Sequence, residues 1–116
     1  MLSSKDIISI KDLSRDSILH ILDTTDYLLD HKTKHETMRG KILATVFYET
    51  STRTKISFNV AMKRLGGNVI GFSHLKNSSF LKGESFYDTL KILEGYCDIM
   101  ALRAPWEGAA RYAGEI

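Results

Sequence analysis

The residue types in the run Ser51-Thr52-Arg53-Thr54 are suited to holding a doubly charged anion. Three hydroxyl groups can donate hydrogen bonds, and a guanidinium offers a charged fork that matches phosphate oxygens. The run lies between an apolar stretch at residues 42–48 and a helical pattern at residues 52–65. The first turn of a helix adds unpaired backbone N–H groups and the positive end of the helix dipole. This combination predicts a phosphate site. The plainer interpretation is that Ser51 caps the helix and Arg53 is a solvated surface residue.

Two further cationic side chains follow the next two predicted strands. Lys82 lies in the loop after residues 69–72, and Arg103 comes directly after residues 98–102. Because ligands of parallel α/β sheets bind beyond the carboxyl ends of the strands, we expect these charges to meet around one anionic ligand. Taken singly, Lys82 also fits an ordinary surface loop, and Arg103 also fits a structural ion-pair partner.

The order of the elements predicts an α/β fold in which helices flank a parallel sheet. A helix capped by Ser14 is expected to run to about Asp30. The predicted alternation of strands and helices then covers, in order, residues 41–48 (strand), 52–65 (helix), 69–72 (strand), 86–93 (helix) and 98–102 (strand). The residues of these helices expected to face the sheet are Ile56, Val60, Ala61, Leu65, Phe86, Leu90 and Leu93.

Glycines and the end of the chain give two more expectations. Gly66-Gly67 should end the second of these helices through a left-handed residue. Residues 107–116 begin a further helix that carries no C-terminal cap. We therefore expect the doubly wound fold to be incomplete at its C-terminus and the chain to be a fragment.

Composition bounds the class of protein. A chain of 116 residues that is 43% apolar and 26% charged predicts one soluble domain over residues 1–116. A net charge of +2 gives no general case for a nucleic-acid or membrane partner. The single cysteine, Cys97, lies among apolar neighbours and is expected to be a buried, inert thiol in a reducing compartment, which favours a cytoplasmic location.

Several other kinds of site have no support in the sequence. His31 and His35 are four residues apart, but no third ligand accompanies them, so we expect a solvated connection and no metal. No Walker-type lysine loop and no dinucleotide-binding glycine motif occur. No nucleophile–histidine set stands out. Any chemistry should therefore come from positioning and charge stabilisation.

Four motifs, in this order along the chain, resemble the carbamoyltransferase family and its aspartate branch in particular. They are FYETSTRTKISF (residues 47–58), KRLGG (63–67), SSFLKGES (78–85) followed by Asp88-Thr89, and RAPWEGAAR (103–111). The first motif is shared with ornithine carbamoyltransferases, whereas the loop from Ser78 to Glu84 points to the aspartate enzymes.

The resemblance implies a function for each matched residue. Carbamoyl phosphate would be bound by Ser51, Thr52, Arg53, Thr54 and Arg103. Arg53, Thr54 and Arg103 would be catalytic, with Arg103 and Thr54 polarising the carbonyl oxygen. The amine of L-aspartate would attack the carbamoyl carbon, giving N-carbamoyl-L-aspartate and phosphate for de novo pyrimidine biosynthesis. No cofactor is implied.

The resemblance also implies partners. Ser78 and Lys82 would be donated to the neighbouring subunit, which predicts a homotrimer of catalytic chains, and a regulatory chain is a further possible partner. The aspartate-binding domain, with later carbamoyl phosphate contacts, would lie beyond Ile116. We therefore expect no transfer by this piece alone.

Four positions depart from the family pattern: Thr50 replaces a usual proline, Lys55 an arginine, Asn59 a glutamate, and Ala104 a histidine. None of these changes removes a matched binding residue. Two alternatives stay open beside the aspartate enzyme. One is a non-catalytic phosphate-binding module or truncated paralogue, and the other is an ornithine carbamoyltransferase.

Overall fold

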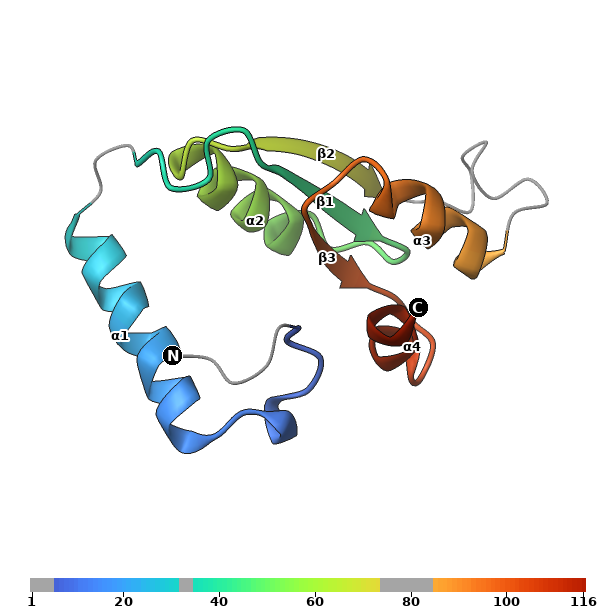
Figure 1. Cartoon of the computed structure of the whole chain (residues 1–116), viewed down its shortest axis with the longest axis horizontal. Helices are drawn as coiled ribbons and strands as arrows, with labels where there is room; N and C mark the ends of the chain where they lie inside the picture. Colours follow the sequence, from blue (N-terminus) through green and yellow to red (C-terminus); the bar gives the residue numbers. More distant parts are fainter. Residues whose placement is uncertain (1–5, 32–34, 74–84) are drawn as a thin grey trace. The chain divides into compact units, whose positions relative to one another are not determined.

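The structure, a computed structural model, describes residues 6–31, 35–73 and 85–116 (Figure 1). The chain divides into two compact units, Met1–Thr33 and Lys34–Ile116. The first unit contains the short 3-10 helix η1 (Ile10–Asp12) and the helix α1 (Arg15–Asp30). Ser14 caps α1 as expected, because its Oγ accepts a hydrogen bond of 3.0 Å from the Ser17 backbone N–H.

The second unit is built on a parallel sheet of three strands, which confirms the predicted α/β class. Its strands are β1 (Ile42–Phe47), β2 (Asn68–Ser73) and β3 (Ile99–Arg103). The strand order is β2-β1-β3, so β1 is the central strand and pairs in parallel with both neighbours. All residues of β1 after Ile42 are buried, as expected for a strand covered on both faces.

Helices α2 (Thr52–Arg64) and α3 (Phe86–Glu94) pack on opposite faces of this sheet. Ala44 and Val46 of β1 form a core cluster with Leu93 of α3. Thr45 points to the other face, where its Oγ1 lies 3.4 Å from Oδ1 of Asn59 in α2. The fourth helix, α4 (Ala109–Glu115), follows β3 and begins after Gly108, two residues later than the sequence pattern predicts.

The predicted orientation of α2 is wrong. Ile56 and Val60 are 54% and 43% exposed, and the buried residue of the helix is Met62. The stripe that faces the sheet contains Met62 together with the half-buried residues Lys55 and Asn59. A lysine has a long apolar stem that can cover a sheet while its ammonium stays near water. A count of apolar residue types therefore assigned the buried face to the wrong side of the helix. The expectation for α3 is confirmed, since Leu90 and Leu93 are buried and Phe86 packs against the core.

The predicted end of α2 is confirmed. Gly66 has a left-handed φ of +87°. The N–H of Gly67 donates to the carbonyl of Met62 at 3.0 Å, and the N–H of Gly66 donates to that of Lys63 at 3.1 Å. These two bonds form a Schellman motif, which satisfies carbonyls at the end of the helix and turns the chain into β2.

We expect Gly66→Ala to lower the free energy of unfolding more than Gly40→Ala does. Both glycines have a positive φ, so each alanine pays about 1–2 kcal/mol for the left-handed conformation. A Cβ on Gly66 would also lie 2.9 Å from the backbone oxygen of His35, whereas a Cβ on Gly40 meets nothing within 4 Å. The difference between the two variants should be at least about 1 kcal/mol in urea unfolding. Equal losses would contradict the described packing at Gly66.

Candidate anion-binding site

The N-terminus of α2 is not capped by its own side chain. Ser51 occupies the N-cap position, but it makes no side-chain hydrogen bond to the first turn. The corresponding residues of the other two long helices, Ser14 and Ser85, do accept such bonds from the backbone. The interpretation of Ser51 as a helix cap therefore lacks its hydrogen bond. Its hydroxyl and the first-turn N–H groups are left available to a ligand.

The first turn of α2 also contains no acidic residue, whereas the first turns of α1 and α3 contain Asp16 and Asp88. Instead it contains Arg53, which is exposed and forms no ion pair with any described residue. Thr52 is exposed and Thr54 is half-buried. Since carboxylates normally compensate the positive end of a helix, this helix presents an uncompensated positive terminus to an anion.

Arg103 lies at the edge of the sheet where the carboxyl ends of the strands meet. It is the last residue of β3 and pairs with Phe47, the last residue of β1. The Tyr48 backbone N–H extends this pairing by donating to the Arg103 carbonyl at 2.8 Å. Four residues then lead from Phe47 to Thr52, the first residue of α2. The parallel register thus places the run Ser51–Thr54 and Arg103 at neighbouring carboxyl ends, as expected from the sequence.

The side chain of Arg103 is engaged with a carboxylate. Its Nε lies 3.6 Å from Oε1 of Glu49, and the two side chains are 48% and 43% exposed. The alternative in which Arg103 is an ion-pair partner therefore has a structural basis. Glu49 was not recognised from the sequence as part of the site. The available signal was a carboxylate two residues before the Ser51–Thr54 run. A pair this exposed is weak, because water screens it, and a dianion can compete for the guanidinium.

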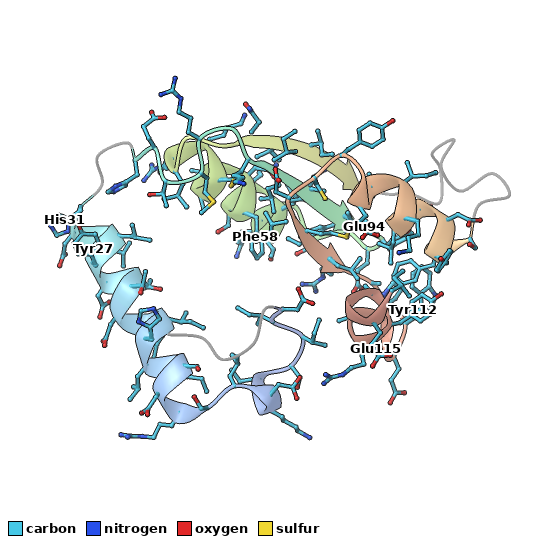
Figure 2. All side chains as sticks on the ribbon, in the orientation of Figure 1. Tyr27, His31, Phe58, Glu94, Tyr112 and Glu115 are labelled. Atoms are coloured by element: carbon cyan, nitrogen blue, oxygen red, sulfur yellow. The ribbon has the colours of Figure 1, made fainter. Side chains whose placement is uncertain are left out.

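An aromatic cluster joins the segments that follow β1 and β3. The ring centroids of Tyr48 and Trp106 are 4.9 Å apart, and each ring also packs against Phe86 of α3, at 5.3 and 5.2 Å. Tyr112 of α4, which is labelled in Figure 2, stacks on Phe86 with the ring centroids 5.9 Å apart. Packed aromatic pairs of this kind add about 0.5–1.5 kcal/mol each beyond the burial of their area. The cluster holds together the segments that follow β1 and β3, beside Glu49 and Arg103.

The predictions about Ser78, Lys82, metal binding and membrane-spanning helices can be compared only with the described residues. Ser78 and Lys82 lie outside the described residues. Within the described ranges, no group of three or more His, Cys, Asp or Glu side chains is arranged to hold a metal ion. In the same part of the chain, no helix combines the length and the hydropathy that crossing a membrane requires.

Cys97 is half-buried against the core cluster rather than fully buried. Burial, the largest cause, and the nearby carboxylate of Asp98 raise the pKa of its thiol above the usual value. The thiol therefore stays protonated near neutral pH, which agrees with an inert side chain and not with a nucleophile.

Comparisons with known proteins decide the family. Residues 5–115 match the model of the aspartate/ornithine carbamoyltransferase carbamoyl-P binding domain. The chain belongs to the aspartate/ornithine carbamoyltransferase family. It is 54% identical over 114 residues to the aspartate carbamoyltransferase catalytic subunit of Methanocaldococcus jannaschii, covering 96% of this chain and 37% of that protein. It is 53% identical over 112 residues to the corresponding subunit of Methanococcus maripaludis, with 94% and 37% covered.

Solved structures of carbamoyltransferases agree with this assignment. The fold is similar to that of the M. jannaschii catalytic subunit, with a TM-score of 0.88 and 54% identity over 97% of this chain and 38% of that one. It is also similar to an aspartate transcarbamoylase of Trypanosoma cruzi solved with carbamoyl phosphate and aspartate. There the TM-score is 0.83 and the identity 34%, over 98% of this chain and 36% of that one. The chain thus spans little more than a third of the length of these relatives.

We expect Cys97 to react slowly with iodoacetamide at pH 8. Its raised pKa leaves less thiolate than in a free cysteine, so the rate should be lower than that of a model thiol. The rate should rise with pH, because the thiolate appears only as the pH approaches the raised pKa. Mass spectrometry of the alkylated chain over pH 7–10 measures both effects. A rate at pH 8 equal to that of the model thiol would contradict the burial of this side chain.

Proposed function

We propose that Ser51, Thr52, Arg53, Thr54 and Arg103 bind the carbamoyl phosphate used by an aspartate carbamoyltransferase catalytic chain. The observation that carries the proposal is the helix α2, whose N-terminus has neither a side-chain cap nor an acidic residue and lies at the edge where Arg103 ends β3. The family supplies the ligand class, since the matching family model is that of a carbamoyl-P binding domain over residues 5–115.

In the proposed reaction, the chain acts by charge and position. The α2 N-terminus and Arg53 hold the phosphate group of the substrate, while Arg103 and Thr54 donate to its carbonyl oxygen. The aspartate amine attacks the carbamoyl carbon, so that a C–N bond forms, the C–O bond to phosphate breaks, and the proton lost by the amine leaves with the phosphate. Negative charge grows on the carbonyl oxygen and on the leaving phosphate, and both changes are stabilised by fixed donors. No step requires a cofactor.

Arg103 must change partner in this scheme. In the structure its guanidinium lies beside Glu49, at 3.6 Å. Carbamoyl phosphate brings two negative charges and several acceptor oxygens, the carbonyl oxygen among them, and the guanidinium fork of Arg103 can donate to two of these oxygens at once. Binding of the substrate would therefore draw Arg103 away from a single half-exposed carboxylate.

Residues 1–116 would form part of the carbamoyl phosphate-binding domain of a longer enzyme. This proposal is supported by relatives of which the chain covers about 37%. The aspartate-binding domain would lie in the remainder of such a chain. We also propose that Ser78 and Lys82 complete the site of a neighbouring subunit in a homotrimer, with or without a regulatory chain. The product would enter de novo pyrimidine biosynthesis in the cytoplasm.

A second candidate is a module that binds phosphate without transferring the carbamoyl group. It is supported by one observation, namely that the family model matched over residues 5–115 describes a carbamoyl-P binding domain. The two candidates share the anion site and differ in turnover. Carbamoyl aspartate formation by the chain in its native assembly separates them, because the module would bind inorganic phosphate and form no product. Ornithine carbamoyltransferase activity is disfavoured, since the relatives compared above are aspartate enzymes.

We expect Arg53→Ala to abolish binding of carbamoyl phosphate and of inorganic phosphate in calorimetry. Losing one charged donor to a dianion should remove about 2.7–4 kcal/mol of stabilisation, which is at least a hundredfold in affinity. Arg64→Ala is the matched control, since it removes the same charge from the last turn of the same helix. The control should bind like the unchanged chain. Wild-type affinity in Arg53→Ala, or an equal loss in Arg64→Ala, would contradict the assignment.

We expect Glu49→Gln to tighten phosphate binding by about two- to fivefold, because it removes both a competing partner of Arg103 and a nearby negative charge. The free energy of unfolding should change by less than about 1 kcal/mol, since the pair is half-exposed. Glu107→Gln removes one negative charge from the segment after β3 and should leave affinity nearly unchanged. Weaker binding in Glu49→Gln would mean that Glu49 orients Arg103 toward the anion instead of competing with it.

A further inference from the structure

A third cation, Lys55, lies in α2 two residues after Arg53. Its side chain extends over β2, because a Cβ atom placed on Gly71 would lie 3.0 Å from Lys55 Cε and 3.2 Å from its Nζ. The absence of a side chain at Gly71 leaves room for the lysine there. The Lys55 ammonium therefore lies over β2 at the level of Gly71, beneath the anion-binding edge.

The distance from the Lys55 ammonium to the carboxyl-terminal edge of the sheet follows from the strand register. Gly71 pairs with Thr45, and two residues further on Ser73 pairs with Phe47 at the carboxyl end. At about 3.3 Å per residue, the ammonium lies roughly 7 Å below the edge. This distance is shorter than the Debye length of about 8 Å at physiological ionic strength, so salt does not fully screen its field at the edge.

No described residue neutralises the charge of Lys55. Among the described residues it forms no ion pair. The position one turn later on the same face, where a glutamate would pair with it, holds Asn59. The Asn59 amide oxygen lies 3.4 Å from the hydroxyl of the fully buried Thr45. These two described polar side chains near the lysine stem are neutral.

We propose that Lys55 is a non-contacting charge that strengthens dianion binding at the N-terminus of α2, and that Asn59 keeps this charge unpaired. The inference rests on the proposed function and deepens it: the affinity for the phosphate group is set in part by the residues at positions 55 and 59, beneath the site. Lys55 is not a catalytic residue, because its ammonium lies over Gly71 and not at the edge itself. Its apolar stem also fills space between α2 and β2, so the test must separate charge from packing.

The test is calorimetric titration of the chain with inorganic phosphate at several salt concentrations. Lys55→Met keeps the stem and removes the charge, and we expect phosphate affinity to fall about three- to tenfold. The dependence of log Kd on log salt should become shallower, which a purely structural defect would not produce. Lys55→Arg should restore both affinity and slope.

Substitutions at position 59 provide an independent test of the same inference. Asn59→Glu places a carboxylate beside an intact Lys55, and we expect it to weaken phosphate binding by a factor similar to that of Lys55→Met. Asn59→Gln is the matched control and should bind like the unchanged chain. If Lys55→Met fails to fold, the variants at position 59 still test the contribution of the Lys55 charge, because they leave the lysine side chain in place.

The outcomes separate this inference from the proposed function. Unchanged affinity in both Lys55→Met and Asn59→Glu, together with a loss in Arg53→Ala, overturns the contribution of Lys55 and leaves the phosphate site standing. Weakened binding with an unchanged salt slope assigns Lys55 a packing function and overturns the inference. An unchanged chain that binds no phosphate overturns both.

Discussion

The parallel pairing of β1 with both of its neighbours is the constraint on which the rest of the second unit depends. It makes Phe47, Ser73 and Arg103 end at one edge, although they are far apart in the sequence. The pairing also buries β1 on both faces, so α2 and α3 must lie on opposite sides of the sheet. An uncapped helix N-terminus and an arginine from β3 are thereby brought to the same edge of the sheet.

The fold was largely predictable because its signals are local. The apolar run of β1, the cap at Ser14 and the glycine end of α2 each depend on a few adjacent residues, and all appear where expected. The orientation of α2 was not predictable in the same way. Which face of a helix is buried depends on the side chains of the sheet beneath it. Here Gly71 leaves room for the stem of Lys55, although lysine is a residue type normally expected to be exposed.

Only the cationic residues of the candidate site could be predicted from the sequence. Arg53 and Arg103 could be placed at the sheet edge because the strand pattern fixes the direction in which parallel strands end. The carboxylate of Glu49 and the neutral Asn59 beneath the site could not be related to these charges from spacing, since their contacts depend on side-chain conformations. Ser78 and Lys82 lie outside the described residues, and their proposed place in the site comes only from the family resemblance.

The central claim is that separated cations at one sheet edge share a single dianion. A crystal structure of the chain with inorganic phosphate tests it most directly. We expect one phosphate at the first turn of α2, within hydrogen-bonding distance of the Ser51–Thr54 run and of the guanidinium groups of both Arg53 and Arg103. A phosphate bound elsewhere, or guanidinium groups that point away from each other with no anion between them, would contradict the account.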